Sequence, residues 1–343
     1  MVTPLPPPTN ILVICVTRIG DTLAITPALQ AIGVHWPDAK ITVLGGRKRA
    51  EVLKHLPYIH TVGYISKNSA PLSGWLAPKK YDLAIVYNFD IELVKYAIRV
   101  SKRVIAYRQG DPRIEHQLYD HKELVETEIG HLTDIGSNRV RHLGIAVNTG
   151  RIQYTVTPQE TAHAKSMLAD AGLSGVHPLI GLQPVSFATK SYRNWPLGHF
   201  KSLCLAIMEQ WPNSRFIIFG GPDDSSLVSA LANDIGMGAV SLAGKLTLRE
   251  TGAMMSLLDT YIGVDTGPTH LMSSFDIPII GLYHSRHKSH ILGPKDHPFN
   301  FSIDHPYPDD KNGQPRPMSD ITVERVLESV NQALASFPKG EPS

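Results

Sequence analysis

The sequence predicts an α/β protein made of two halves, each with its own parallel β-sheet. Short apolar runs rich in branched residues alternate with segments of helical periodicity, which is typical of parallel strands covered by helices. The alternation blurs between about residues 111 and 157 and then starts again. The chain has 343 residues, more than one domain of roughly 100–200 residues requires. We therefore expect two α/β halves joined near residues 150–175.

In the first half, the strands are the short apolar runs. The first is Ile11–Val16, whose sequence ILVICV suits a strand buried on both faces. A helix is expected from Thr22 to about Val34, where Pro37 and Asp38 break the pattern. Further strands are expected at Lys40–Leu44, Val62–Ile65, Leu83–Tyr87 and Val104–Tyr107. The rest of this half is expected to form a helix at Lys48–His55, a polar helix at Leu124–Leu143 and an extended connector at Arg151–Val156.

The second half shows the same alternation, without a close sequence repeat of the first. Strands are expected at Leu179–Leu182, Arg215–Phe219, Thr260–Val264 and Ile279–Tyr283. Helices are expected at Pro158–Ala171, Leu197–Gln210, Ser225–Asp234, Leu248–Leu257, from Thr269 onwards and at Ile321–Ala335. Because open α/β sheets bind ligands at the carboxyl ends of their strands, two facing halves would place a cleft between those ends.

The composition excludes several classes of protein. Lys and Arg number 33 against 31 Asp and Glu, and this near balance argues against a dedicated nucleic-acid-binding protein. The only two cysteines are Cys15 and Cys204, too few for a disulfide framework or a cysteine-rich zinc site. No apolar run has the length of a transmembrane helix, and the N-terminus lacks the pattern of a signal peptide. We expect a soluble, cytoplasmic protein and leave open a peripheral contact with the inner face of the membrane.

Three common catalytic motifs are missing. No G-x-G-x-x-G follows the first strand, which disfavours a nicotinamide or flavin enzyme. No Walker A motif is present, because Leu246 stands after Gly244 and Lys245 where Ser or Thr is required. No G-x-S-x-G segment marks an α/β-hydrolase.

The segment Arg18-Ile19-Gly20-Asp21 directly follows the first strand. Gly20 allows a tight turn between strand and helix, so we expect Asp21 at or near the helix N-cap, at the ligand-binding edge of the sheet. A carboxylate in this place can serve as a general base. The alternative is that Asp21 only caps the helix.

Two further segments follow strands of the second half. Asp265-Thr266-Gly267-Pro268-Thr269-His270 offers backbone N–H groups at a helix start, which suits a diphosphate, and Thr266 or Thr269 can add a hydroxyl. The loop 186–196 carries Ser186, Thr189, Lys190 and Arg193, side chains that suit phosphate recognition. The alternatives are an ordinary capped helix start with proline in its first turn and a solvated loop anchored by Trp195.

Three other groups are less specific. Asp223 or Asp224, after Gly220 and Gly221, can bind ribose hydroxyls or can merely cap a turn. His284, His287, His290 and His297 have only Asp296 as a carboxylate among them, so we expect a cationic loop near the cleft rather than a metal site. Arg47-Lys48-Arg49 begins the expected helix Lys48–His55, where cations oppose the helix dipole. This placement indicates an anionic partner, with solvated surface charge as the alternative.

Three segments together resemble glycosyltransferase family 9, the family of lipopolysaccharide core heptosyltransferases. They are RIGD with the following TLAITPAL, LAGKLTLRE at 242–250, and YIGVDTGPTHLMSSFDIPIIGLY at 261–283. The resemblance covers the chain from Asn10 to the terminal helix. It implies a GT-B fold, with two Rossmann-like domains facing across a cleft. The acceptor-binding domain would span 10–160, the nucleotide-sugar-binding domain 175–320 and a C-terminal helix 321–336.

The resemblance also implies an activity: inverting transfer of heptose from ADP-L-glycero-β-D-manno-heptose to the lipid A–Kdo inner core, without metal or cofactor. Asp21 falls on the family's catalytic aspartate and would be the general base. The donor set would be Ser186, Thr189, Lys190, Arg193, Asp224, Asp265, Thr266, Gly267 and His270, with either Lys190 or Arg193 on the diphosphate. Arg47, Lys48 and Arg49 would bind the anionic acceptor.

Two departures leave alternatives open, and one of them is that a cysteine pair found late in many members of the family is missing here. His284-Ser285-Arg286-His287-Lys288 stands where the family usually has G-P-T-D-P, so the donor sugar and the acceptor position are not fixed by the resemblance. The alternatives are a family 9 transferase that uses another nucleotide sugar for O-antigen or capsule, a non-catalytic carbohydrate-binding relative, and a nucleotide-sugar epimerase of GT-B form.

Overall fold

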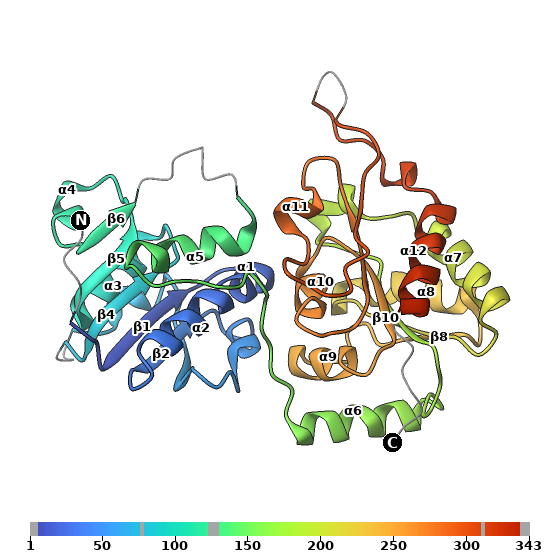
Figure 1. The fold of residues 1–343 in the computed structure, drawn as a ribbon, viewed down its shortest axis with the longest axis horizontal. Coiled ribbons are helices and arrows are strands. Elements are labelled where there is room, and N and C mark those ends of the chain that lie inside the picture. Colours follow the sequence, from blue (N-terminus) through green and yellow to red (C-terminus); the bar gives the residue numbers. More distant parts are fainter. Residues whose placement is uncertain (1–5, 76–78, 123–129, 310–312, 337–343) are drawn as a thin grey trace. The chain divides into compact units, whose positions relative to one another are not determined.

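The computed structural model describes residues 6–75, 79–122, 130–309 and 313–336. The chain divides into two compact units, the first ending at Thr155 and the second beginning at Val156. Within the described residues, each unit holds one sheet of six strands, and all neighbouring strands are parallel (Figure 1). The predicted α/β class with two parallel sheets is therefore confirmed.

The first sheet has the strand order β3-β2-β1-β4-β5-β6. Its central strand β1 pairs on both sides, with Ile11 opposite Ile41 and Leu83. Every apolar side chain of β1 is buried. A strand buried on both faces requires apolar residues at successive positions, which explains the continuous apolar run in its sequence. The strands are β1 (Asn10–Cys15), β2 (Lys40–Gly45), β3 (Thr61–Tyr64), β4 (Tyr81–Val86), β5 (Ser101–Tyr107) and β6 (Asp120–Lys122).

The first unit contains five α-helices among its described residues, and two of them replace one predicted helix. The helix expected from Thr22 begins earlier, at Ile19, and is divided at Ile25. Pro27 lies in the first turn of the second piece and has no N–H to continue the hydrogen-bond ladder. The helices are α1 (Ile19–Ala24), α2 (Thr26–His35), α3 (Ile91–Val100), α4 (Pro112–Glu115) and α5 (Leu132–His142), with 3₁₀ turns η1 (Ala50–Leu53) and η2 (Ala70–Leu72).

Other helix predictions in this unit need correction. The helix expected at Lys48–His55 was wrong, because only η1 forms there. Lys48 (φ 70°) and His55 (φ 69°) have left-handed backbone that interrupts a helix at both ends. Of the polar helix expected at Leu124–Leu143, α5 forms, whereas residues 123–129 lie outside the described residues. Helix α3 was not predicted, although the Asp90 carboxylate caps it.

The second sheet has the order β12-β11-β10-β7-β8-β9. In each sheet, the first and fourth strands of the unit lie side by side, β1 with β4 and β7 with β10. The strand order reverses at this point, and such switch points are where open α/β sheets bind ligands. The strands are β7 (Leu179–Gln183), β8 (Arg215–Ile218), β9 (Ala239–Ser241), β10 (Thr260–Val264), β11 (Ile279–Tyr283) and β12 (Ile303–Asp304).

The helices of the second unit mostly match the sequence pattern. Helix α10 begins at Gly267, two residues before the expected start, and the C-terminal helix α12 buries Val326, Val330 and Ala333 in the core of this unit. The helices are α6 (Pro158–Asp170), α7 (Leu197–Gln210), α8 (Ser225–Ile235), α9 (Leu248–Met255), α10 (Gly267–Met272), α11 (Ser289–Leu292) and α12 (Val323–Ser336). Short 3₁₀ helices are η3 (Ala188–Arg193), η4 (Pro222–Asp224) and η5 (Met318–Asp320).

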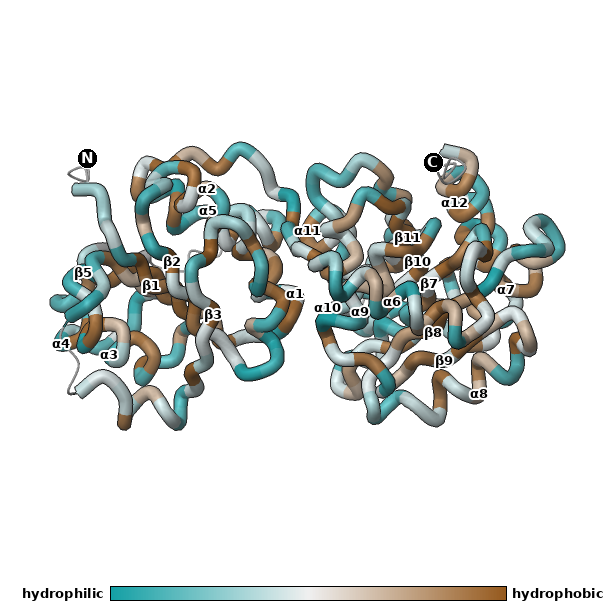
Figure 2. Tube along the Cα trace, turned by 90° about the horizontal axis from the view of Figure 1, so that it is seen from below, coloured by the Kyte–Doolittle hydropathy of each residue, from teal (hydrophilic) through white to brown (hydrophobic). Residues whose placement is uncertain are grey.

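Apolar residues concentrate along the strands of both sheets (Figure 2). In the second sheet, Gly263 and Gly281 are paired across β10 and β11, and each makes room for a tyrosine ring of its own strand. A Cβ at Gly263 would lie 2.6 Å from the Tyr261 ring. The Tyr261 hydroxyl reaches the Thr269 hydroxyl at 3.0 Å, and Thr269 Oγ1 donates to the carbonyl at the end of β10 at 2.6 Å. This buried series of hydrogen bonds fixes the position at which α10 begins.

Within the described part of the chain, no helix is long and apolar enough to cross a membrane.

Candidate active site

At the switch point of the second sheet, a buried carboxylate lies between two basic side chains. Asp265 directly follows β10, and its side chain is only 2% exposed. Arg193 Nη1 lies 2.6 Å from Asp265 Oδ2, and His270 Nε2 lies 3.6 Å from Asp265 Oδ1. Three of the residues predicted for donor binding are thus brought together, from the loop after β7 and the turn after β10.

The loop after β7 is folded rather than solvated. Ser186 Oγ lies 2.8 Å from both the carbonyl oxygen of Lys190 and Asn194 Oδ1. The same Asn194 oxygen accepts the Ser186 N–H at 2.8 Å. These contacts close the loop around η3 and hold Arg193 where it meets Asp265. Ser186 therefore stabilises the conformation of the loop. Asn194 is a site residue that the sequence analysis missed.

Two cations of this loop have different surroundings. Arg193 is ion-paired, whereas Lys190 forms no ion pair with any residue that the structure describes. The Lys190 ammonium and the Arg193 guanidinium carbon each lie 5.7 Å from the centre of the Tyr192 ring. Lys190 is partly exposed and Thr189 beside it is exposed, whereas the Arg193 side chain is only 14% exposed.

The two threonines of the turn after β10 are not equivalent. Thr269 is buried and its hydroxyl is bonded inside the unit. Thr266 is the N-cap residue of α10, yet its hydroxyl makes no capping hydrogen bond. Of the two candidates, Thr266 has the hydroxyl that can bind a ligand beside the Gly267 N–H.

Asp224 acts as a capping residue. Its Oδ2 accepts the Gly221 N–H at 3.2 Å at the start of η4. The capping alternative weighed for this position is therefore present in the structure, and a ribose contact would need the other carboxylate oxygen.

Two more residues belong to this site, of which His287 was named only as part of the histidine-rich segment and Gln183 was missed. His287 follows β11, the neighbour of β10. Burial, and then the nearby Arg193 guanidinium, lower its pKa below the ordinary histidine value. Gln183 ends β7, where its Nε2 donates to the Val185 carbonyl at 2.8 Å. Its Oε1 is buried and has no hydrogen-bond partner among the described residues. The only available signal for Gln183 was its position at the carboxyl end of a strand.

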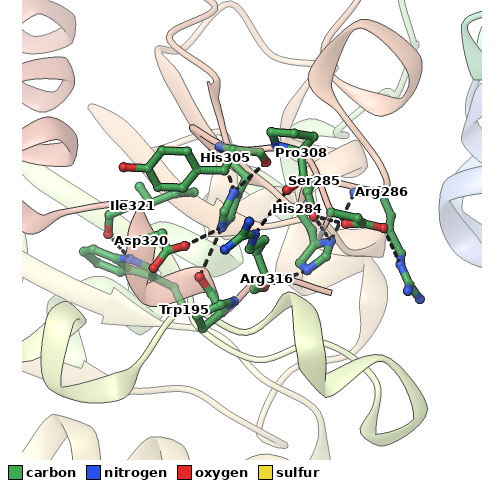
Figure 3. Close-up of polar contacts among 12 residues, drawn as sticks. Trp195, His284, Ser285, Arg286, His305, Pro308, Arg316, Asp320 and Ile321 are labelled. Carbon is green, nitrogen blue, oxygen red and sulfur yellow. Dashed lines mark hydrogen bonds and ion pairs between the residues drawn. The ribbon is translucent and has the colours of Figure 1, made fainter. Parts of the chain in front are cut away.

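The histidine-rich segment carries the cations Arg286 and Lys288, but its first histidine does not add to the positive charge. His284 is fully buried. Its Nδ1 accepts the Arg286 N–H at 3.1 Å, while its Nε2 lies 3.0 Å from the Arg316 carbonyl (Figure 3). These bonds require the neutral ring, and burial lowers the pKa of His284. In the described part of the chain, no group of three or more His, Cys, Asp or Glu side chains could hold a metal ion.

The same segment is joined to the stretch before α12. Arg286 Nε donates to Asp309 Oδ2 at 2.8 Å, and Ser285 Oγ donates to the other oxygen of that carboxylate. His305, also buried, lies 3.1 Å from the Pro317 carbonyl (Figure 3). The histidines therefore fix the backbone beside the site.

In the first unit, Asp21 lines a cavity at the other switch point. It is the third residue of α1 and lies near the N-cap residue Arg18, as predicted, without being the cap itself. Its Oδ2 accepts the Thr17 hydroxyl at 2.9 Å. The cavity has a volume of about 280 Å³ and is lined by Cys15, Thr17, Asp21, Ala24, Ile25, Tyr87, Asn88, Phe89, Tyr107, Leu132, Ile135 and Gly136.

The basic triplet lies on the turn that leads into η1, with Arg49 as the N-cap residue of that short 3₁₀ turn, and no α-helix follows, so the helix-dipole argument for it was wrong. Arg47, Lys48 and Arg49 are all exposed. Arg49 Nη1 donates to the Thr17 carbonyl at 3.2 Å, beside the Asp21 hydrogen bond. Arg47 and Lys48 remain exposed on the turn after β2.

Two Rossmann-like units, each with polar side chains at its switch point, define a GT-B protein. The model of "Glycosyltransferase family 9 (heptosyltransferase)" matches residues 112–313, more than half of the chain. The chain therefore belongs to glycosyltransferase family 9 and is a glycosyltransferase by family, as the resemblance indicated.

Curated relatives and solved structures agree with this assignment. The chain is 25% identical over 283 residues to lipopolysaccharide heptosyltransferase 3 of Escherichia coli, covering 77% of this chain and 80% of that one. It is 19% identical to the lipopolysaccharide core heptosyltransferase OpsX of Haemophilus influenzae over 282 residues, 80% of this chain and 79% of that one.

Among solved structures, a family 9 glycosyl transferase from Veillonella parvula has a TM-score of 0.85 at 19% identity, over 96% of this chain and 98% of that one. The E. coli ADP-heptose lps heptosyltransferase II has a TM-score of 0.77 at 18% identity, over 95% and 99%. At these identities the structures establish the fold, and the predicted GT-B fold is confirmed.

Proposed function

We propose that this chain transfers heptose from ADP-L-glycero-β-D-manno-heptose to the lipopolysaccharide inner core, with inversion at the anomeric carbon. The first unit binds the acceptor and the second binds the nucleotide sugar. The observation that carries the proposal is the family 9 match of a chain that keeps Asp21 at one switch point and Arg193 with Asp265 at the other. The names of the relatives, lipopolysaccharide heptosyltransferases, support the choice of donor and acceptor.

The donor diphosphate is bound by the second unit. Lys190 and Arg193 supply positive charge, and Thr266 with the Gly267 N–H supplies hydrogen-bond donors at the turn after β10. Asp265 keeps Arg193 in place through this ion pair, whose Nη1–Oδ2 distance is 2.6 Å. These cations perform the task of a metal ion, which is to stabilise the charge that develops on the leaving ADP. His270 and Asp224 would contact the sugar and the ribose.

The bond-making step uses Asp21. An acceptor hydroxyl attacks the anomeric carbon opposite the leaving group, its proton passes to the Asp21 carboxylate, and the bond from carbon to the phosphate oxygen breaks. A neutral hydroxyl is a weak nucleophile, so a positioned base is required. The Thr17 hydroxyl holds one Asp21 oxygen at 2.9 Å and leaves the other for the proton.

The acceptor carries phosphates and Kdo carboxylates, which need positive charge on the protein. Arg47 and Lys48 on the exposed turn after β2, with Arg49 beside Thr17, supply it. This contact would also bring the protein to the inner face of the cytoplasmic membrane.

A second candidate is a family 9 transferase with another nucleotide sugar. The specific observation is the segment His284–Lys288, in which the buried His284 and the semi-buried His287 lie beside the donor site. Calorimetric titration with ADP, UDP and GDP separates the two, followed by mass spectrometry of the product made from ADP-heptose and a heptose-deficient core. Tightest binding of ADP and a heptose mass increment are expected. If UDP or GDP bound more tightly than ADP, the donor in the proposal would be a UDP-sugar or a GDP-sugar instead of ADP-heptose.

A further inference from the structure

Two aromatic rings in the wall of the Asp21 cavity, Phe89 and Tyr107, form a layered stack with the buried Arg139 guanidinium, which does not itself line the cavity. The Phe89 ring stacks on the Tyr107 ring, with centroids 4.1 Å apart and planes 12° from parallel. The Arg139 guanidinium carbon lies 3.4 Å from the centre of the same Tyr107 ring. One ring face has no room for both groups at these distances. Phe89 and Arg139 therefore cover opposite faces, and we call this arrangement the Phe89–Tyr107–Arg139 stack.

The inner end of the stack is a buried cation. Arg139 is 3% exposed, and its Nη1 donates to the Val86 carbonyl. Its Nε and Nη2 have no hydrogen-bond partner, and it forms no ion pair, within the part of the chain that the structure describes. Its charge is balanced by the Tyr107 face and by the Tyr87 ring, whose centre is 5.1 Å away. The guanidinium thus holds the Tyr107 ring in one position.

The outer end of the stack is open. Phe89 follows β4 at the carboxyl end and is 56% exposed, while lining the same cavity as Asp21 and Thr17. A single exposed apolar side chain is common on a protein surface. Phe89 differs because Tyr107 and Arg139 pack behind its ring and hold it in place. A ring fixed in advance loses little conformational entropy when a ligand covers it.

We propose that Phe89 is a stacking platform for a pyranose ring of the acceptor. The C–H face of the sugar lies on the open face of Phe89, and a hydroxyl on the ring edge reaches Asp21. The negative face of an aromatic ring attracts the weakly positive C–H groups. The cavity of about 280 Å³ is near the small end of ligand sites, roughly 300–1,000 Å³, which suits one sugar ring. This inference rests on the proposed function, and makes Phe89 a positioning residue for the acceptor.

The test compares three variants in the transfer assay. Phe89→Ala removes the platform, and we expect the acceptor KM to rise about tenfold, the size of one good aromatic contact. The donor KM should not change. Phe89→Trp should restore the acceptor KM, because any aromatic face can stack. Trp75→Ala is the matched control, since Trp75 is a 70% exposed ring that also carries an arginine, Arg99, at 4.7 Å, but does not line the cavity. An acceptor KM within twofold of the wild type in Phe89→Ala would overturn the proposal.

A binding experiment separates this proposal from the proposed function. Saturation-transfer NMR with a deacylated Kdo–heptose core oligosaccharide is expected to show transfer to the ring protons of one sugar face, and to lose it in Phe89→Ala. If the wild type transfers no heptose but shows this signal, the platform stands and the proposed function fails. If the wild type transfers heptose without any signal that depends on Phe89, the platform fails alone.

Discussion

Arg193 Nη1 lies 2.6 Å from Asp265 Oδ2, although the two residues belong to loops that follow different strands of the second sheet. Their side chains are 14% and 2% exposed. Buried charges are tolerated when they are paired, and removing one partner leaves the other buried and unpaired. The pair therefore connects the stability of the second unit with the position of the cation proposed for the diphosphate.

Arg193→Met is expected to destabilise the protein by about 3 kcal/mol, because Asp265 then keeps a buried charge with less compensation. Adding Asp265→Asn should recover most of the loss. Urea unfolding of the wild type, both single variants and the double variant measures the coupling. Both the Met variant and the double variant should bind ADP more weakly. Strictly additive losses in stability would show that the two residues do not act as a pair.

Asp21→Asn is expected to lower kcat by about 10²–10⁴-fold, the usual contribution of a general base. The Asn side-chain oxygen can still accept the Thr17 hydroxyl, so the melting temperature and ADP affinity should barely move. Steady-state kinetics with saturating acceptor measures the effect. The exposed Asp38→Asn in the same unit is the matched control and should keep its kcat. Near-normal turnover in Asp21→Asn would show that a group other than Asp21 is the general base.

Reversing the charges of Arg47 and Lys48 to Glu is expected to raise the acceptor KM and spare the donor KM. Both side chains are exposed, so folding should be intact. The effect should shrink as salt is raised, because exposed charges are screened over a length of about 10 Å at 0.1 M ionic strength. Lys67→Glu, another exposed reversal in this unit, controls for net charge. Equal acceptor KM in the reversed variant and the control would remove the turn from the acceptor site.

Activity is expected to survive EDTA, since the charge on the leaving ADP is neutralised by Lys190 and Arg193 in the proposed mechanism. Rates after chelation and after adding back Mg²⁺ or Mn²⁺ test this. An absolute requirement for either ion would contradict the donor site described above.

The lowered pKa of Glu160 predicts that the free energy of unfolding depends on pH. Burial alone would raise its pKa, but hydrogen bonds from Arg249 and the Thr157 N–H lower the pKa to about 2, from an ordinary value of 4.5. Arg249 contacts both oxygens, at 2.7 and 2.6 Å. A lowered carboxyl pKa stabilises the fold above the unfolded value and loses this contribution as the pH falls from about 4.5 towards 2.

The measurement is the free energy of unfolding of the wild type and Glu160→Gln between neutral and acid pH. The variant should be the less stable at neutral pH, and the difference should narrow as the pH drops below about 4.5. A difference that stays constant over this range would show that the Glu160 carboxylate is not titrating against its partners.

The strands that could be predicted include those buried on both faces, such as β1 and β10, and also the four-residue edge strand β3. The short edge strands β6, β9 and β12 were missed, because two or three residues paired on one side leave little periodicity in the sequence. The helix expected at Lys48–His55 failed for a different reason. Its residues have helical composition, but the left-handed backbone at Lys48 and His55 is set by the surrounding turn and not by residue type.

The same distinction applies to the sites. Asp21, Asp265 and Arg193 could be named because each follows a strand at the carboxyl edge of its own sheet. Arg139 could not, because a cation on an amphipathic helix ordinarily faces water. Its burial depends on how α5 packs beside Tyr107, and that contact joins positions distant in the sequence.

The two six-stranded sheets, as far as the structure describes them, share no strand, and each has its own reversal of strand order. A substitution after β1 or β4 thus changes one sheet's ligand edge and leaves the backbone of the other intact. Natural selection can alter the recognition of one substrate while the other is conserved. A family built on this plan can diversify by altering one sheet at a time.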